Sequence, residues 1–214
     1  VDGIVIRTFA HHHAEEFARH SRVPVINGLS DLVHPCQALA DLLTIEEHFG
    51  HLEGLRLGYV GDGNNVLHSL MAGAAMTGMH VAAAVPDGYR PDASVWQEAT
   101  RWAKTTGATL RRETDPRRAV RDADVVYTDV WVSMGQEQER RKRLRVFRPY
   151  QLNAALLRHA KPGCRVMHCL PAHRGEEITE EVLEGPRSLV FEQAENRLYA
   201  HKALLHLLFG EVTR

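Results

Sequence analysis

Short apolar runs alternate along this chain with longer segments in which apolar residues recur every three or four positions. The short runs are rich in valine and isoleucine, as in β-strands, and the longer ones have the period of amphipathic helices. The expected strands are residues 3–7, 23–27, 56–60, 80–85, 108–111, 125–128, 165–168 and 189–191. The expected helices lie near 12–20, 36–49, 65–78, 93–106, 116–122, 151–159 and 195–209. This alternation predicts an α/β fold with a doubly wound parallel sheet of the Rossmann type.

A domain boundary is predicted at residues 50–54, because glycines there follow a long amphipathic segment and precede a new strand–turn–helix unit. Residues 1–35 are then interpreted as the remnant of a first α/β domain, 36–51 as an interdomain helix and 52–187 as a second domain. A last strand and helix are expected in 188–214. The chain opens on an apolar strand, and chain ends usually lie outside a core, so we expect it to be part of a longer protein.

The charge balance argues against several classes of partner. The net charge is −1 and acidic and basic residues are well mixed, so no field attracts nucleic acid or an anionic membrane. The densest basic run, 140–143, is interpreted as a solvated helix face because glutamates stand beside it. No apolar run approaches the ~20 residues of a membrane span. Three cysteines without a Cys-x-x-Cys pair favour neither disulfides nor a zinc ribbon, so we expect a cytoplasmic protein.

Fourteen histidines raise the question of a metal site. His11, His12 and His13 lie in an expected helix, where neighbouring side chains point about 100° apart and cannot converge on one ion. The cluster of His168, Cys169 and His173 lacks a fourth ligand that the sequence would nominate. We therefore expect neither a metal nor an organic cofactor.

A glycine-rich turn at 58–63 (Gly-x-x-Gly-x-Gly) follows one expected strand and opens a helix, as in dinucleotide-binding enzymes. A nicotinamide-dependent oxidoreductase is therefore an alternative. It is disfavoured because Val66 stands where a small residue is needed, and because the next strand does not end in an acid. Two amides, Asn64 and Asn65, come next. At the carboxyl end of a strand, where such sheets bind ligands, amides can hold the carboxylate of an amino acid.

Further candidate side chains follow other strands whose carboxyl ends share that edge of the sheet. Asp129 can bind a cationic amine through charge-assisted hydrogen bonds, or simply cap a turn. Cys169 offers a thiol that could contact an attacking amine, although a lone buried cysteine is more often inert packing. Pro171 keeps Leu170 out of helical geometry, which leaves the Leu170 carbonyl available to a ligand.

Two more groups of polar residues lie near the ends of the chain. His34 precedes Pro35, which favours a helix start, and His34 and Gln37 can bond a carbonyl and an amide or act as a cap and a surface residue. Arg7 ends the first strand and supplies a fixed positive charge for a phosphate or a developing oxyanion. Arg197 can do the same, or form an ordinary ion pair with a neighbouring glutamate.

Five motifs resemble, in order and kind of spacing, those of the aspartate/ornithine carbamoyltransferase family, and among its members the ornithine enzymes. They are His34-Pro-Cys-Gln, Gly61-Asp-Gly-Asn-Asn, Asp129-Val-Trp-Val-Ser-Met-Gly, His168-Cys-Leu-Pro and Glu195-Asn-Arg. The resemblance implies transfer of a carbamoyl group from carbamoyl phosphate to the δ-amine of L-ornithine. The family's Ser-Thr-Arg-Thr phosphate-binding segment is missing from these 214 residues, so we expect them to turn over slowly on their own.

The resemblance also implies the roles of individual residues. Carbamoyl phosphate would be bound by Arg7, His34, Pro35, Cys36, Gln37, Cys169, Leu170 and Arg197. Ornithine would be bound by Asn65, Asp129, Ser133 and Met134. The catalytic residues would be Arg7, His34, Asp129 and Cys169.

The same resemblance implies that the final helix packs back on the first domain and that subunits assemble as trimers or multiples of trimers. Related acceptors, namely N-acetylornithine, putrescine and aspartate, stay open as alternatives, as does a non-catalytic ornithine-binding fragment. Relatives that use aspartate carry a Pro-Leu pair in place of Cys169 and Leu170, so this cysteine favours a cationic amine.

Overall fold

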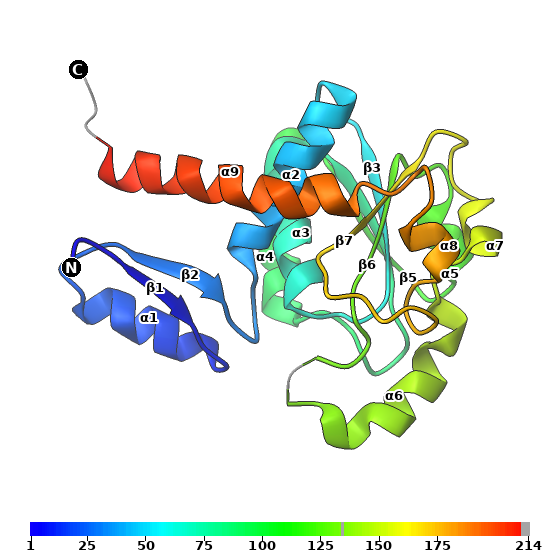
Figure 1. Cartoon of the computed structure of the whole chain (residues 1–214), viewed down its shortest axis with the longest axis horizontal. Coiled ribbons are helices and arrows are strands. Elements are labelled where there is room, and N and C mark those ends of the chain that lie inside the picture. The colour runs from blue at the N-terminus through cyan, green and yellow to red at the C-terminus, as the bar shows by residue number, and fades with distance from the viewer. Residues whose placement is uncertain (134, 211–214) are drawn as a thin grey trace.

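The computed structural model describes residues 1–133 and 135–210 and contains two parallel sheets (Figure 1). The smaller sheet pairs β1 (Ile4–Arg7) with β2 (Val25–Leu29), which α1 (His11–His20) connects. The larger sheet has the order β5-β4-β3-β6-β7. Its strands are β3 (Arg56–Val60), β4 (His80–Ala84), β5 (Leu110–Glu113), β6 (Val125–Thr128) and β7 (Arg165–His168). The predicted α/β fold with parallel strands is confirmed.

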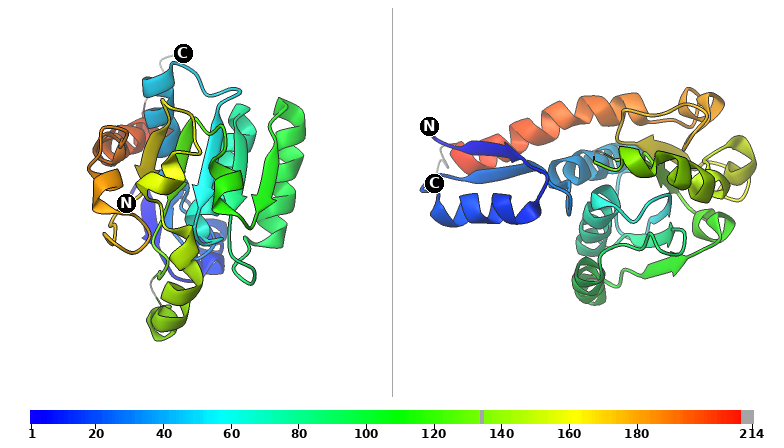
Figure 2. Two further views of the ribbon diagram at one scale, coloured as in Figure 1. Left: turned by 90° about the vertical axis from the view of Figure 1, so that its right-hand side faces the viewer. Right: turned by 90° about the horizontal axis from the view of Figure 1, so that it is seen from below.

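Helices cover both faces of the larger sheet (Figure 2). One face carries α2 (Pro35–Phe49), α3 (Asn65–Thr77), α4 (Ala93–Thr106) and the start of α9 (Val190–Phe209). The other carries α5 (Pro116–Val120), α6 (Arg140–Phe147), α7 (Ala154–Leu157) and α8 (Glu180–Leu183), with short 3₁₀ turns η1 (Glu137–Glu139) and η2 (Arg148–Tyr150). This is a three-layer, doubly wound arrangement.

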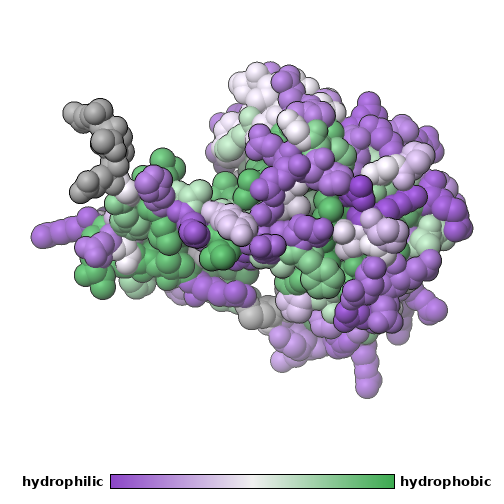
Figure 3. Space-filling view, turned by 45° about the horizontal axis from the view of Figure 1, so that its top comes forward, coloured by the Kyte–Doolittle hydropathy of each residue, from purple (hydrophilic) through white to green (hydrophobic). Residues whose placement is uncertain are grey.

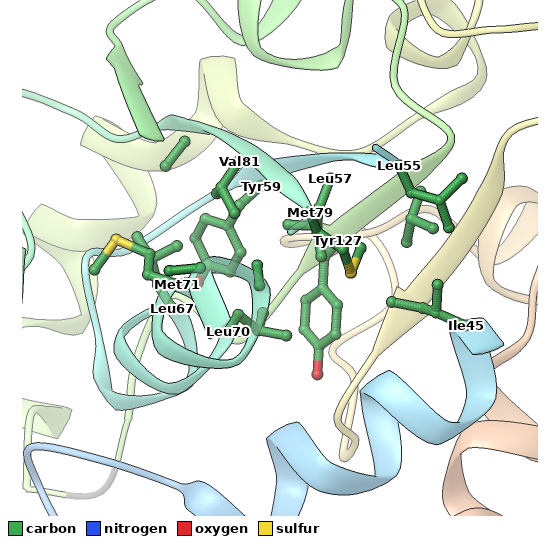
Figure 4. Packing of buried hydrophobic residues seen from close by; sticks show 14 of the residues in the cluster. Ile45, Leu55, Leu57, Tyr59, Leu67, Leu70, Met71, Met79, Val81 and Tyr127 are labelled. Carbon is green, nitrogen blue, oxygen red and sulfur yellow. The ribbon is translucent and has the colours of Figure 1, made fainter. Parts of the chain in front are cut away.

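Alternate residues of each strand fill two separate cores, because successive side chains of a strand point to opposite faces. Leu57 and Tyr59 of β3 pack against α3, as Figure 4 shows, whereas Val60 lies in the core of the other face. Gly58 is required on that second face, since a Cβ there would stand 2.8 Å from the carbonyl oxygen of Ala119 in α5. The buried strands thus appear in the sequence as nearly continuous apolar runs.

The expected strand at 189–191 is wrong. Only Ser188 forms an isolated bridge to Val166 of β7, and α9 begins at Val190, five residues before the helix that we expected at 195. The apolar triplet is followed by good helix formers, and the first helical bond, from Gln193 N to Leu189 O at 2.8 Å, already includes it. The helix α8 was not expected, whereas α6 includes the basic run 140–143, which the sequence predicted to lie on a helix.

The far end of α9 reaches the small sheet, where the ring of Phe209 lies against Gly3 of the segment before β1. The same end of the molecule exposes a group of apolar side chains (Figure 3), which includes Val5, Phe17 and Leu207. Among the described residues nothing covers this face. The division into domains at 50–54 stays a prediction. None of the helices described is at once long and apolar enough to cross a membrane.

Candidate active site

The carboxyl ends of β3 and β6 form the switch point of the larger sheet. From β3 the chain runs outward through β4 to β5, and it later returns to place β6 on the other side of β3. Helices that follow the two strands leave toward opposite faces, and doubly wound sheets bind ligands in the crevice at such a switch point. The loop 61–65 after β3 and Asp129 after β6 both lie at this crevice.

A hydrogen bond joins the two loops across the switch point. Asn64 caps α3, because its Oδ1 accepts from the backbone amides of Val66 and Leu67. The Nδ2 of Asn64 then donates to Asp129 Oδ2 at 2.6 Å. Asp129 is only 4% exposed, so this bond and the one described next set the direction of its carboxylate.

Cys169 supplies the second hydrogen bond to that carboxylate. Its Sγ donates to Asp129 Oδ1 at 2.9 Å, although the two residues are 40 positions apart in sequence. Burial raises the pKa of the Cys169 thiol well above its usual range, and the adjacent negative charge of Asp129 raises it further. The thiol is therefore protonated at neutral pH and acts as a donor rather than as a nucleophile.

We expect iodoacetamide to modify Cys169 slowly at pH 8, because alkylation needs the thiolate. Replacement of Asp129 by asparagine removes a negative charge beside the sulfur and is expected to speed the reaction several-fold. Peptide mass spectrometry reports the rates of all three cysteines separately. Cys36 and Cys164 serve as internal controls, and equal acceleration at all three would mean that the substitution had only loosened the fold.

The Leu170 backbone is held by the side chain of His168, two residues earlier in the chain. Leu170 adopts a φ of +53°, and its amide donates to His168 Nδ1 at 2.9 Å. His168 Nε2 in turn lies 3.2 Å from the buried carboxylate of Glu177, which fixes the tautomer with the proton on Nε2. The conformation of the segment 168–171, which follows β7, is thus set by a buried His–Glu pair.

A second group of site residues gathers where α2 begins beside α9. His34 precedes Pro35 at the first position of α2, as the sequence predicted, and its backbone amide donates to Ser69 Oγ at 2.8 Å. Burial lowers the pKa of His34 to about 4, with the positive charges of Arg197 and Arg7 adding to the shift. The imidazole is therefore neutral at pH 7. His201, one turn beyond Arg197, belongs to the same cluster.

Buried nitrogens of this cluster lack partners. His34 Nδ1, Arg197 Nε and His201 Nε2 form no hydrogen bond within the described part of the chain. A buried polar atom without a partner costs about 1–3 kcal/mol. Positive charge together with such nitrogens suits an anion that carries several acceptor oxygens, for example a phosphate.

Gln37 and Cys36 have partners in the protein. Arg197 Nη1 donates to Gln37 Oε1 at 2.5 Å, and Gln37 Nε2 donates to Asp41 Oδ1 at 2.8 Å. The oxygen of Gln37 keeps a second lone pair for a ligand. The Cys36 thiol is buried and lies 3.5 Å from the carbonyl oxygen of Asn27.

The remaining predicted ornithine ligands are Asn65, Ser133 and Met134. Asn65 begins α3, and its Nδ2 donates to the carbonyl oxygen of Ser30 at 2.7 Å, which leaves one amide hydrogen for a ligand. Ser133 lies four residues after Asp129, and its backbone amide donates to Gln136 Oε1 at 3.0 Å. Met134 lies outside the described residues.

The interpretation of 140–143 as a solvated face is wrong for one residue. Arg143 is 4% exposed and forms a buried ion pair with Asp62, which lies in the turn after β3. It also donates to the carbonyl oxygen of Trp131 at 2.5 Å and stacks on the ring of Tyr89. Arg143 therefore ties the turn after β3 to the segment that follows Asp129.

Two groups of candidate metal ligands have partners within the protein. Asp129, His168 and Cys169 lie close enough to share an ion, but both nitrogens of His168 and both oxygens of Asp129 form bonds within the protein. Of the histidine triplet, the Nδ1 atoms of His11 and His13 contact different hydroxyls, those of Ser30 and Thr8. These arrangements do not suit a metal ion.

The glycines at 58–63 have packing reasons that are unrelated to a dinucleotide. Gly58 accommodates α5, as described above, and a Cβ on Gly63 would stand 2.3 Å from the backbone nitrogen of Pro91.

The sequence reasoning did not identify several buried polar residues that connect the two groups. They are Asp41, Tyr127 and Gln193, and the half-buried His201 beside Arg197 was missed as well. One signal was available, since Asp41 stands four residues after Gln37 on the apolar side of a predicted helix, where an acid needs a partner.

Comparisons with known proteins identify the family to which the chain is similar. A family model described as aspartate/ornithine carbamoyltransferase, Asp/Orn binding domain, matches residues 53–208. A second, described as the carbamoyl-P binding domain of the same family, matches residues 1–47. An ornithine carbamoyltransferase from Carboxydothermus hydrogenoformans is 58% identical over 214 residues, which cover 98% of this chain and 68% of that protein.

Solved structures of similar proteins superpose closely on the chain. An ornithine carbamoyltransferase from Pyrococcus furiosus is 52% identical and has a TM-score of 0.96, covering 100% of this chain and 68% of that one. The enzyme from Gloeobacter violaceus is 54% identical with a TM-score of 0.92, covering 98% of this chain and 70% of that one. The chain thus spans about two thirds of the length of the relatives that it matches.

Proposed function

We propose a function for this chain, which belongs to the aspartate/ornithine carbamoyltransferase family. The proposed reaction transfers the carbamoyl group of carbamoyl phosphate to the δ-amine of L-ornithine and gives L-citrulline and phosphate. The observation that carries the proposal is the contact between the protonated thiol of Cys169 and the carboxylate of Asp129 at the switch point of the sheet. The names of the relatives, which are ornithine carbamoyltransferases, support this choice of acceptor.

In this proposal ornithine lies in the crevice between β3 and β6. Asp129 and Ser133 bind its α-ammonium group, and Asn65 binds its carboxylate. Cys169 contacts the δ-amine, which must lose a proton because an alkylamine of this kind has a pKa of about 10.4 in water. A neutral thiol beside a carboxylate can accept a hydrogen bond from an amine that is uncharged.

Carbamoyl phosphate lies between the start of α2 and α9. Arg7 and Arg197 bind the phosphate, neutral His34 donates to the carbamoyl oxygen, and Gln37 and the Leu170 carbonyl accept from its NH2 group. The amine nitrogen attacks the carbonyl carbon, the bond from that carbon to the phosphate oxygen breaks, and the proton lost by the nitrogen passes to the departing phosphate. Arg7 and His34 stabilise the negative charge that develops on oxygen during the attack. Pro35 and Cys36 contribute by fixing the start of the helix.

Citrulline formation tests the function directly. The purified protein, in the complete length that its gene encodes, is supplied with carbamoyl phosphate and ornithine, and the 214 residues alone are assayed in parallel. We expect turnover by the complete protein and slow turnover by the 214 residues. Absence of citrulline from both preparations, with a folded protein, would contradict the proposal, and ornithine binding without turnover would favour a non-catalytic fragment.

The acceptor is tested by competition among amines. Ornithine is expected to give a higher kcat/KM than N-acetylornithine, putrescine or aspartate, because only ornithine presents an α-ammonium group, a carboxylate and a side-chain amine to the residues named above. A preference for any of the other three would overturn the assignment of the substrate. Binding of NADH, followed by fluorescence, would instead revive the oxidoreductase alternative.

Replacement of Arg197 by glutamine is expected to raise the KM for carbamoyl phosphate about tenfold to a hundredfold, the effect of losing hydrogen bonds to a charged group. The KM for ornithine should change little. Lys202 to glutamine is the control, because Lys202 is exposed on the same helix. Steady-state kinetics with each substrate varied in turn separates the two constants, and equal changes in both would argue against a phosphate ligand at this position.

The proposal includes the oligomeric state, the pathway and the compartment of the enzyme. We infer a homo-oligomer, a trimer or a multiple of one, that acts in arginine metabolism in the cytoplasm. The apolar side chains exposed near β1 and the end of α9 support association with further protein. Sedimentation of the complete protein measures the assembly, and a monomer at micromolar concentration would contradict it.

A further inference from the structure

A carboxylate with no part in the proposed reaction lies fully buried between the two groups of site residues. Asp41 is on the second turn of α2 and is 0% exposed. Its Oδ1 accepts from the amides of Gln37 at 2.8 Å and Gln193 at 2.7 Å, and its Oδ2 accepts from the hydroxyl of Tyr127 at 3.1 Å. Donors from α2, α9 and β6 thus converge on one acid.

The carboxylate decides which way two amides point. A glutamine can present either its oxygen or its NH2 group to a neighbour, whereas an ionised carboxylate only accepts hydrogen bonds. Gln37 and Gln193 must therefore turn their NH2 groups toward Asp41 and their oxygens away. The oxygen of Gln37 accepts from Arg197 Nη1, and that of Gln193 accepts from the backbone amide of His168 at 3.0 Å.

The two glutamines contact different groups of site residues. Gln37 lies beside Arg197 in the cluster that suits an anion, and His168 immediately precedes Cys169 at the crevice. If Gln37 were reversed, its NH2 group would face Arg197, a donor against a donor, and its oxygen would face Asp41. Such a reversal would remove the acceptor that the carbamoyl NH2 group needs.

We propose that Asp41 is a positioning residue for carbamoyl transfer, which orients Gln37 toward carbamoyl phosphate and, through Gln193, holds the backbone that precedes Cys169. The inference rests on the proposed function. Burial raises the pKa of Asp41 to about 7, against the effect of the three donors, so the carboxylate is mainly ionised at pH 8. That pH is the one chosen for the test.

Two substitutions separate the acceptor from its charge. Asp41→Asn keeps an oxygen for both amides and turns its own NH2 group to the Tyr127 oxygen, whereas Asp41→Leu has a similar shape and no acceptor. We expect D41L to raise the KM for carbamoyl phosphate about tenfold, the size of one lost hydrogen bond to a charged group, and D41N to stay within about threefold of the wild type. Kinetics are measured at pH 8 and 10 °C, where a weakened fold persists.

Thr44→Val is the matched control. Thr44 is also buried on α2, one turn farther from the site, and its hydroxyl accepts from Asn196 of α9 at 3.0 Å. T44V should lower the melting temperature without changing the KM for carbamoyl phosphate. If D41L does not fold, D41A is measured in its place, because it removes the same acceptor without adding apolar atoms.

Failure of this inference can be distinguished from failure of the proposed function. Wild-type turnover is measured first, and a lack of citrulline there would remove the function itself. With turnover established, an unchanged KM in folded D41L or D41A would overturn only the role of Asp41. A tenfold rise in D41N would also overturn it, because charge and not the direction of the amides would then matter.

Discussion

Replacement of Asp129 by asparagine is expected to lower kcat/KM for ornithine about a thousandfold, which corresponds to about 4 kcal/mol of lost stabilisation. The substitution removes the negative charge that would face the α-ammonium group in the proposed function, and it puts an amide against the thiol of Cys169 and the Nδ2 of Asn64. Loss of one partner of a buried, hydrogen-bonded charge pair commonly costs about 2–5 kcal/mol. Citrulline formation at varied ornithine concentration measures the effect.

Asp124→Asn is the control for this prediction. Asp124 precedes the same strand, β6, and therefore lies at the opposite edge of the sheet, where it accepts from Lys161 Nζ and from the Arg56 backbone. This variant should retain kcat/KM within about twofold, because surface ion pairs contribute little. A value for D129N within tenfold of the wild type would mean that ornithine binds elsewhere.

Replacement of Arg143 by glutamine is expected to lower the free energy of unfolding by about 3–5 kcal/mol, because Asp62 would then be a buried carboxylate without its partner. Burial already raises the pKa of Asp62 to about 6, and the Arg143 charge opposes that shift. Without the arginine the pKa of Asp62 rises further in the folded state. Urea unfolding followed by circular dichroism measures the change.

The same variant has a pH signature whose sign follows from linkage. A carboxyl group with a folded pKa above its unfolded value of about 3.9 destabilises the protein increasingly as pH rises between the two values. The stability deficit of R143Q should therefore be larger at pH 8 than at pH 5. Arg141→Gln, at an exposed position of the same run, should stay within about 0.5 kcal/mol of the wild type at both pH values.

The bounds of three strands of the larger sheet could be predicted to the residue. Expected and observed bounds agree at both ends for β3, β6 and β7, because strands covered on both faces must be apolar at nearly every position. The edge strand β5 begins two residues later than expected and contains two exposed arginines, so its apolar pattern marks its limits poorly. The triplet 189–191 misled for a related reason, since an apolar run this short fits a buried helix start equally well.

The candidate site was predicted in part. The residues at the strand ends were found because parallel strands bring all their carboxyl ends to one edge, so a polar residue after a buried run identifies a position near the crevice. Asp129 and Cys169 are the clearest case, being 40 residues apart in sequence and 2.9 Å apart in space. Their roles in binding ornithine stay a prediction.

The sequence by itself therefore determined the fold class, most of the strands and the polar residues at the rim of the sheet, because hydrophobic periodicity and the alternation of strands and helices are local or repetitive properties. Only the tertiary structure decided which buried polar groups meet. Arg143 pairs with Asp62 across 81 residues and Asp41 accepts from Gln193 across 152. Such pairs depend on which helix faces pack together. A buried polar group without a partner costs free energy, so the fold must supply a partner, but no local pattern in the sequence shows which residue that partner is.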